Sequence, residues 1–230
     1  LVMSRWKMFQ EGVIEELPLQ LGVFPFGIIY GILAIESGLT FLQSFLLSSI
    51  IFGGASQIIF VQLISTSTPF GIIISSVAAI NSRHFLYGIS IREYVKHLSV
   101  TWRLLLAYLL TDEAYAVSIR KFNNDPNNEF LHYHLLGTGL TLFIIWQIST
   151  LTGIILGHEL PQFLELQFII PLTFIAIIIP MINSISFICA ALSSATTALI
   201  FKTLDLNLWI LASASIGLIV GVTVSRFDKK

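Results

Sequence analysis

The ionisable side chains Arg83, Asp112 and Glu113 lie in the middle of long apolar stretches of the sequence. If these stretches cross a membrane, a charge at the lipid centre costs about 2.5–3.5 kcal/mol even on lenient scales, so it needs a partner or a wet cavity. Arg83 stays protonated and offers a planar fork of donors that suits a carboxylate. It can neutralise one carboxylate, so the other must be protonated or meet an outside cation, such as a substrate ammonium or a coupling proton. The alternative is a structural ion pair that locks two helices together.

Further polar residues surround Arg83. On a helix, Arg83 and Tyr87 share one face, and Asn81 and His84 share another, because side chains three or four positions apart are neighbours. All four are candidates for binding a substrate. For His84 the sequence leaves two alternatives open, a proton carrier and a packed, hydrogen-bonded residue.

The carboxylates at the centre of the next apolar stretch differ in their surroundings. Asp112 follows Thr111 and shares its helix face with Tyr108 and Tyr115. Glu113 lies about 100° further round the helix, among apolar residues. We therefore expect Asp112 to face a polar interior and Glu113 to face an apolar wall.

Two other stretches contain residues that disturb a helix. Pro25, followed by Phe26 and Gly27, removes a backbone donor and can kink or break the first stretch. A run of small residues in the second stretch suits an unwound segment between half-helices, whose free N–H groups bind anions and whose carbonyl groups hold cations. In both places the alternative is close packing through small residues. The run in the second stretch comprises Gly53, Gly54, Ala55 and Ser56, followed by Gln57.

The composition is that of an integral membrane protein. The chain has 230 residues, of which 55% are hydrophobic and 11% are charged, and its mean hydropathy is +0.87. Soluble domains carry about 25% charged residues. A net charge of −1 gives no footprint for nucleic acid, and the single cysteine, Cys189, belongs to no metal-ligand cluster. Since no catalytic or nucleotide-binding motif is present, we expect neither an enzyme nor a cofactor.

The apolar stretches predict an all-α, polytopic membrane protein with about eight transmembrane helices, at least one of them discontinuous. We expect an interfacial segment at 1–16, a single transmembrane domain at 17–225 and a basic tail at 226–230. The first four spans place their least lipid-compatible residues at their midpoints, which chance would not do. The expected spans are 17–35, 42–65, 70–91, 104–119, 133–157, 168–183, 184–201 and 207–225.

Four motifs occur in order and together resemble the AzlC family, the large subunit of bacterial branched-chain amino acid exporters. They are Pro25-Phe26-Gly27, Phe-Gly-Gly-Ala-Ser-Gln at 52–57, Asn-Ser-Arg-His-Phe-Leu-Tyr-Gly at 81–88 and Leu-Thr-Asp-Glu-Ala-Tyr-Ala at 110–116. The resemblance extends from about residue 17 to the C-terminus. This chain departs from the family pattern at Gly53, where alanine is more frequent, and at Ser82, where a larger apolar residue is frequent.

The resemblance implies export of valine, leucine, isoleucine and related amino acids such as methionine. It also implies a small AzlD-type membrane subunit and a multi-pass location in the bacterial cytoplasmic membrane; a higher oligomer is compatible with it. The resemblance does not say which residues touch substrate, and the midplane argument assigns Arg83 to a carboxylate and Asp112 or Glu113 to an ammonium or a proton. The alternative functions are a gated channel for another small solute and a membrane scaffold that transports nothing.

Overall fold

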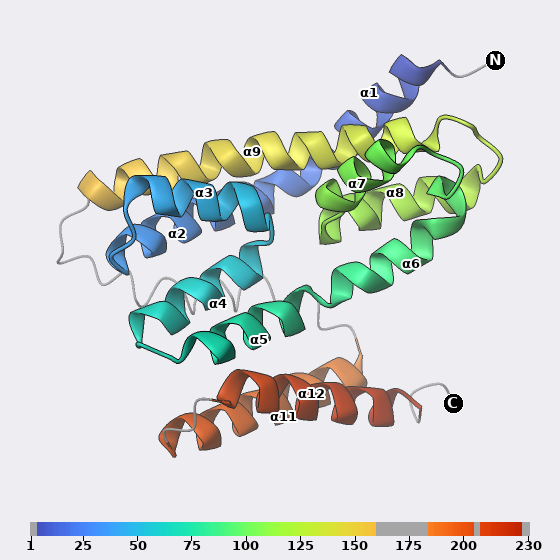
Figure 1. The fold of residues 1–230 in the computed structure, drawn as a ribbon. Coiled ribbons are helices and arrows are strands. Elements are labelled where there is room, and N and C mark those ends of the chain that lie inside the picture. The colour runs from blue at the N-terminus through green and yellow to red at the C-terminus, as the bar shows by residue number, and fades with distance from the viewer. Residues whose placement is uncertain (1–3, 160–183, 205–207, 227–230) are drawn as a thin grey trace. The chain divides into compact units, whose positions relative to one another are not determined.

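The structure is a computed structural model that describes residues 4–159, 184–204 and 208–226 (Figure 1). Within these ranges every regular element is a helix, which confirms the prediction of an all-α chain. The expected span at 168–183 lies outside the described residues. The helices are α1 Arg5–Glu16, η1 Leu17–Leu19, α2 Gln20–Glu36, α3 Phe41–Ile51, α4 Gly54–Ser65, α5 Phe70–Asn81, α6 Arg83–Val95, α7 Val100–Leu109, α8 Asp112–Asn124, α9 Leu131–Glu159, α11 Ile185–Thr203 and α12 Trp209–Ser225.

Several helices have the length and apolar composition that crossing a membrane requires. In the described part of the chain, 4 helical segments meet both conditions, namely Arg5–Glu36, Phe70–Val95, Leu131–Gly157 and Ile185–Thr203. Shorter apolar helices are Phe41–Ile51, Gly54–Ser65, Val100–Leu109 and Trp209–Ser225. The predicted total of eight spans therefore stays a prediction.

The structure corrects the expected continuity of one span and shows a local interruption in another. The stretch 104–119 is divided at Leu110 and Thr111 into α7 and α8, whereas Ser82, between α5 and α6, keeps right-handed helical backbone angles, so Phe70–Val95 remains one helical segment. Asparagine, serine and threonine side chains compete with helical hydrogen bonds by bonding to nearby backbone groups, which favours such interruptions. The predicted discontinuity in the second stretch is present at Phe52 and Gly53.

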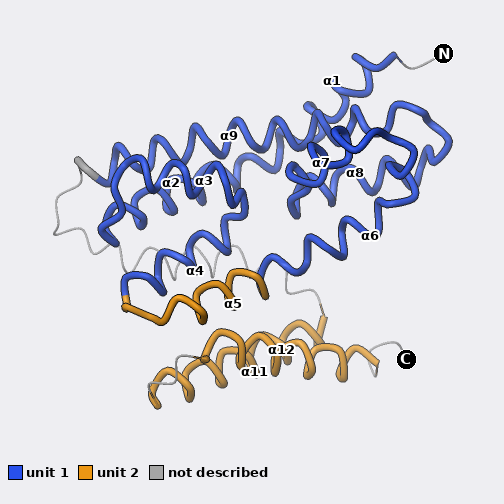
Figure 2. Tube along the Cα trace, in the orientation of Figure 1, with its two compact units in different colours: residues 1–65, 80–161 blue, residues 66–79, 162–230 orange. Residues whose placement is uncertain are grey.

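The chain divides into two compact units, residues 1–65 with 80–161 and residues 66–79 with 162–230 (Figure 2). All residues that the sequence singled out for binding belong to the first unit. The predicted division into an interfacial segment, a transmembrane domain and a tail stays a prediction.

In the first unit, α9 runs parallel to the continuous stretch formed by α1, η1 and α2. Gly12 packs on the backbone of His134, and Gly31, further along, packs on that of Thr150. A Cβ atom on Gly31 would lie 2.5 Å from the Thr150 carbonyl oxygen, so these backbones approach too closely for any side chain. This is the packing that small residues permit between membrane helices.

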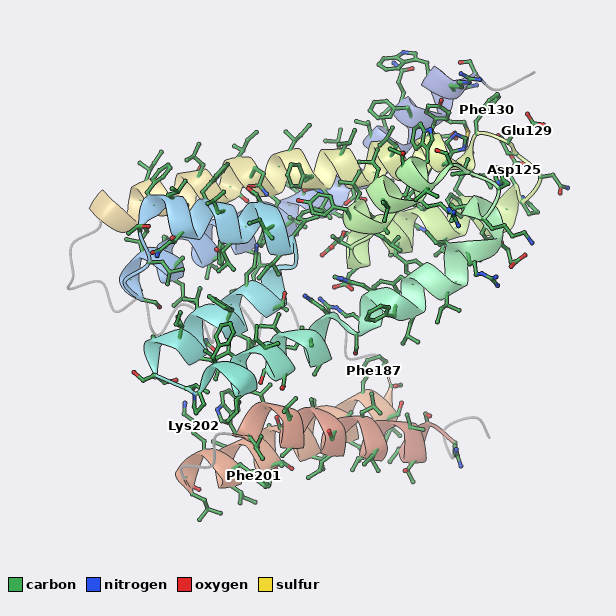
Figure 3. All side chains as sticks on the ribbon, in the orientation of Figure 1. Asp125, Glu129, Phe130, Phe187, Phe201 and Lys202 are labelled. Atoms are coloured by element: carbon green, nitrogen blue, oxygen red, sulfur yellow. The ribbon has the colours of Figure 1, made fainter. Side chains whose placement is uncertain are left out.

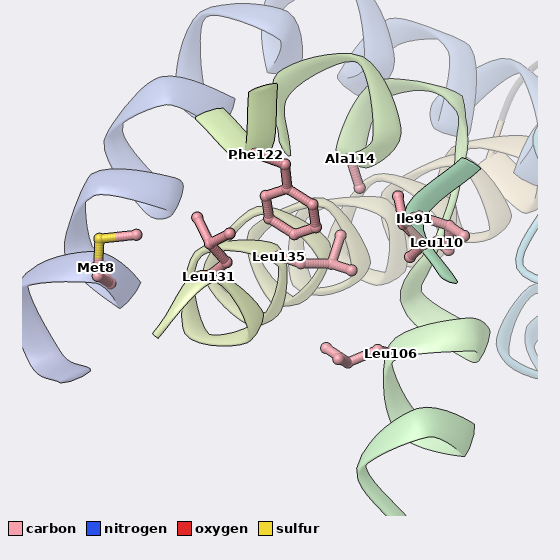
Figure 4. Packing of buried hydrophobic residues seen from close by; sticks show 8 residues of the cluster. All are labelled: Met8, Ile91, Leu106, Leu110, Ala114, Phe122, Leu131 and Leu135. Carbon is pink, nitrogen blue, oxygen red and sulfur yellow. The ribbon is translucent and has the colours of Figure 1, made fainter. Parts of the chain in front are cut away.

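An apolar cluster joins α1, α6, α7, α8 and α9 at one end of this unit (Figure 4). Arg5 lies beside the cluster, with its guanidinium 5.7 Å from the ring of Phe130, which is labelled in Figure 3. The cluster holds the first turns of α8 and α9 against α1. Its buried members are Met8, Ile91, Leu106, Leu110, Ala114, Phe122, Leu131 and Leu135.

In the second unit, α11 and α12 form an antiparallel hairpin. Gly217 packs on Ser194 and Gly221 packs on Ala190, so α12 runs back along α11. Near the turn of the hairpin, the Lys202 ammonium lies 5.9 Å from the ring of Trp209.

Candidate functional site

Helix breaks define the candidate site, because each break starts a new helix with free backbone N–H groups. Phe52 ends α3 in a left-handed conformation, with φ 30° and ψ 60°, and α4 begins at Gly54. Arg83 is the first residue of α6, and Asp112 is the first residue of α8. The residues with the most chemistry therefore stand at helix N-termini.

Contacts between side chains bring these breaks together within the first unit. A Cβ atom on Gly53 would lie 3.3 Å from Asn81 Oδ1, which puts the end of α5 against the break between α3 and α4. The rings of Phe52 and Tyr108 lie 5.9 Å apart, which brings the end of α7 to the same break. Arg83 then joins α6 to α8.

Arg83 and Asp112 form an ion pair, with Arg83 Nη2 2.7 Å from Asp112 Oδ2. The Tyr87 hydroxyl donates to Asp112 Oδ1 over 2.7 Å, so both carboxylate oxygens are engaged. The side chains of Arg83 and Asp112 are 38% and 35% exposed, so the pair is open on one side. We refer to Gly53, Asn81, Arg83, Tyr87 and Asp112 as the break cluster.

Aromatic rings and hydroxyl groups support this ion pair. Tyr87 stacks on Tyr115 with ring centroids 4.4 Å apart, and the Tyr115 hydroxyl hydrogen-bonds Ser90 Oγ at 2.9 Å. The His84 ring lies 5.9 Å from the Tyr87 ring, beside the pair rather than in it. Thr111 precedes α8 at the N-cap position, but its side chain makes no capping hydrogen bond.

Two buried amide oxygens at the breaks have no hydrogen-bond partner within the described ranges, namely Gln57 Oε1 and Asn81 Oδ1. The other end of Gln57 is fixed, because its Nε2 donates to the Leu47 carbonyl over 3.1 Å. Ser56 Oγ donates to the Gly53 carbonyl over 2.7 Å. The site thus offers free acceptors near a guanidinium, an arrangement that can bind an ammonium and a carboxylate together.

The Pro25 segment contributes by packing. The helix α2 continues through Pro25, so the proline does not break it. Gly27 packs against Ser149, and a Cβ on Gly54 would lie 2.6 Å from the Phe26 ring. Phe26 therefore packs against the first residue of α4, while Ala55 lies in that helix's first turn.

A second polar group in this unit is absent from the sequence predictions. Glu16 is 0% exposed, and its Oε1 accepts from Gln20 Nε2 over 2.9 Å. A four-residue spacing, with Met8, Gly12 and Glu16 buried on one face of α1, is the signal that could have revealed it.

Long apolar helices with charges inside the first unit define a polytopic integral membrane protein. The family model described as AzlC protein matches residues 18–160. The chain belongs to the AzlC family, and the matched region contains the four motifs and the whole break cluster.

The relatives that this chain resembles are named as membrane proteins. An uncharacterized membrane protein of Archaeoglobus fulgidus is 30% identical over 220 residues, 94% of each chain. The inner membrane protein YgaZ of Escherichia coli is 29% identical over 155 residues, 67% of this chain and 63% of that protein. An uncharacterized membrane protein of Helicobacter pylori is 27% identical over 112 residues, 48% of each chain. No solved structure matches this chain.

Proposed function

We propose that this protein is the large subunit of a two-component permease that exports branched-chain and related apolar amino acids. The observation that carries the proposal is the partly exposed Arg83–Asp112 pair, at 2.7 Å, where the helices α6 and α8 begin. Export is driven by an ion gradient, and the site lies between the half-helices. We place the protein in the bacterial cytoplasmic membrane. The name of its relative YgaZ describes that relative as an inner membrane protein.

The charges of the pair match those of an amino acid in its zwitterionic form. When the pair opens, Arg83 can bind the substrate carboxylate through its planar fork, and Asp112 can bind the substrate ammonium. The total charge of the site is the same with the pair closed as with the zwitterion bound. A neutral, apolar amino acid therefore enters without leaving a charge unpaired.

The surroundings favour a small substrate with an apolar side chain. Tyr87 and Tyr115 present stacked rings beside Asp112, and Phe52 lies on the other side of Tyr108. The free oxygens of Asn81 and Gln57 are further acceptors for an ammonium. Membership of the AzlC family supports both the branched-chain substrates and a small AzlD-type partner subunit.

A scaffold that transports nothing is the competing function, because an Arg–Asp pair can simply hold two helices together. If the protein is a scaffold, exchanging the two charges in the double variant R83D/D112R should restore every property that Arg83→Gln loses. A transporter predicts a folded but inactive double variant, because the exchanged charges face the substrate in the wrong order. A channel differs from both, since it shows no counterflow.

The test is counterflow of labelled valine in liposomes that contain the full chain together with its AzlD-type partner. We expect counterflow with valine, leucine and isoleucine, and its loss in Arg83→Gln and in the double variant. The matched control is Arg92→Gln on the same helix, because Arg92 is 74% exposed and lies 3.7 Å from Glu93. Absence of counterflow with every apolar amino acid, in a folded complex, would overturn the proposal.

A further inference from the structure

We propose that a pocket between the segment 17–25 and α9 binds small apolar compounds that carry a primary ammonium group and no negative charge. The pocket belongs to the first unit, where α9 runs alongside α2 (Figure 1), and its volume of about 530 Å³ is typical of small-molecule sites. Gln20 and Pro25 line it together with five apolar side chains, which are Leu17, Leu21, Phe24, Ile145 and Ile148. None of these residues belongs to the break cluster, so the inference does not depend on the proposed transport function.

Gln20 is the polar side chain of the pocket, and it is only 6% exposed. Its Nε2 donates to Glu16 Oε1 over 2.9 Å and to the Glu16 carbonyl oxygen over 3.4 Å. A backbone carbonyl can only accept, so these bonds fix which end of the amide is the nitrogen. The opposite atom, Oε1, is buried and has no hydrogen-bond partner among the described residues. A buried acceptor without a donor is unfavourable, so Gln20 offers a place for a donor group of a ligand.

Pro25 leaves a second acceptor in the wall of the pocket. Proline has no N–H, so the carbonyl of Leu21, four residues earlier, lacks the donor that a continuous helix supplies. Leu21 follows Gln20 directly, and both residues line the pocket with Pro25. Two acceptors, one from a side chain and one from the backbone, therefore stand on adjacent residues. A hydroxyl group has a single hydrogen for them, whereas an ammonium group has three, so the ammonium fits best.

The lining disfavours a ligand with a negative charge. No basic side chain is among the described residues around the pocket, so a carboxylate or a phosphate would be buried there without a partner. This distinguishes the ligand from an amino acid, whose carboxylate needs a cation such as Arg83. It also distinguishes the ligand from a phospholipid with an ammonium headgroup, because the phosphate of that lipid has no partner here.

The apolar side chains determine the rest of the ligand. Leu21 is 84% exposed and Ile148 is 53% exposed, so the pocket is open at the flank of the two helices, where lipid surrounds a membrane protein. A branched hydrocarbon group can enter from that side and lie against Phe24 and Ile145 while its ammonium group binds at Gln20. A lipid acyl chain can fill the same space, but it has no donor for Gln20.

The test is photolabelling of the full chain in phosphatidylcholine bilayers, because the headgroup of this lipid has no N–H. The probe is a branched aliphatic amine that carries a diazirine, and mass spectrometry locates the label. We expect label on residues 17–25 and 145–148, and its displacement by isopentylamine. Gln20→Leu should reduce labelling about tenfold, because a hydrogen bond to a charged group is lost. The matched control is Gln10→Leu on α1, where Gln10 is exposed, and it should be labelled like the wild type.

A second pair of variants keeps the test decisive if Gln20→Leu does not fold. Ile148→Trp puts a large side chain into the pocket, whereas Ile155→Trp puts one about two turns further along α9. The two isoleucines are equally exposed, at 53% and 52%, so both variants should fold. Labelling should be lost in Ile148→Trp alone. Equal labelling of the two tryptophan variants, or unchanged labelling of a folded Gln20→Leu, would overturn the site.

Competition tests the class of ligand. Leucine is isopentylamine with a carboxylate added, and isovalerate has the carboxylate without the amine, so neither should displace the probe. Displacement by leucine, by isovalerate or by phosphatidylethanolamine would overturn the preference for a ligand without negative charge. If isohexane displaced the probe as well as isopentylamine does, the pocket would bind hydrocarbon only, and the role of Gln20 would be overturned. Failure of valine counterflow, by contrast, overturns the proposed function and leaves this site unaffected.

Discussion

The break cluster and the buried Glu16 differ in how their charges are balanced. Arg83 and Asp112 neutralise each other at 2.7 Å and are 38% and 35% exposed, whereas Glu16 is 0% exposed and its Oε1 accepts from the neutral Gln20. A pair of opposite charges can open around a zwitterion without a change in total charge. Glu16, by contrast, is closed off from solvent and belongs to no ion pair among the described residues. The difference separates a place that a ligand can enter from a place that is closed by packing.

The two regions also differ in their backbones. The break cluster stands where helices end and begin, so its side chains can move when the half-helices tilt. Glu16 lies on a continuous helical stretch that packs backbone to backbone on α9. We therefore expect substitutions in the break cluster to alter transport more than stability, and substitutions along α9 to alter stability more than transport.

The largest effect on transport is expected for Arg83→Gln. This change removes the partner of Asp112 and the group that binds the substrate carboxylate, at a cost of about 2 kcal/mol or more, roughly a 30-fold loss of counterflow. Thermal melting of the purified protein should change little, because the pair is partly exposed. A fall in melting temperature without loss of counterflow in the surviving protein would reverse the roles assigned to the two regions.

The largest effect on stability is expected for Gly31→Ala. The new Cβ would lie 2.5 Å from the Thr150 carbonyl oxygen, and overpacking of this kind costs about 1–3 kcal/mol. The matched control is Gly22→Ala on the same helix, where nothing lies within 4 Å of the added atom. Thermal melting followed by circular dichroism should show a loss for the first variant alone. Equal melting of both would mean that α2 and α9 are not packed this closely.

Much of the break cluster could be predicted from the sequence, because its residues are conspicuous in apolar surroundings. Arg83 and Asp112 have no other reason to stand at the centres of apolar stretches, and the run after Phe52 has few residues that favour helix. The break at Leu110 and Thr111 and the local interruption at Ser82 were not predicted. A single polar residue in a helix is common, and only the contact with other helix ends makes an interruption there favourable.

Glu16 could not be found in the same way, because its surroundings in the sequence are charged. Glu11, Glu15 and Glu16 read as the polar face of a helix at the membrane surface. Their separation into a buried and an exposed group depends on α9, which lies more than a hundred residues further along the chain. Burial by a distant helix leaves no local pattern other than the spacing of Met8, Gly12 and Glu16.

A smaller effect on transport is expected for Tyr87→Phe. The change removes the hydroxyl that donates to Asp112 over 2.7 Å, but keeps the ring that stacks on Tyr115. Loss of a hydrogen bond to a charged group costs about 1.5 kcal/mol, so counterflow should fall roughly tenfold. The control is Tyr94→Phe on the same helix, whose hydroxyl bonds the uncharged Asn123 at 3.2 Å. Equal losses of counterflow in Tyr87→Phe and Tyr94→Phe would mean that any change on α6 lowers transport, whether or not it affects Asp112.

The smallest effect is expected for Gly53→Ala, and it tests whether the break itself touches substrate. The added Cβ would lie 2.9 Å from Ser56 Oγ and 3.3 Å from Asn81 Oδ1, so these two side chains must shift by a few tenths of an ångström. Because flexible side chains can yield, the total rate should change by about threefold at most, or roughly 0.6 kcal/mol. The ratio of leucine to valine counterflow should change, however, since Asn81 is a free acceptor in the site.

The control for Gly53→Ala is Gly88→Ala on α6, where nothing lies within 4 Å of the added atom. Its substrate ratio should equal that of the wild type. An unchanged ratio in Gly53→Ala as well would separate the break between α3 and α4 from the substrate, and would confine binding to the Arg83–Asp112 side of the cluster. A changed ratio at an unchanged total rate would instead show that this break shapes the space for the substrate, while the ion pair supplies the binding energy.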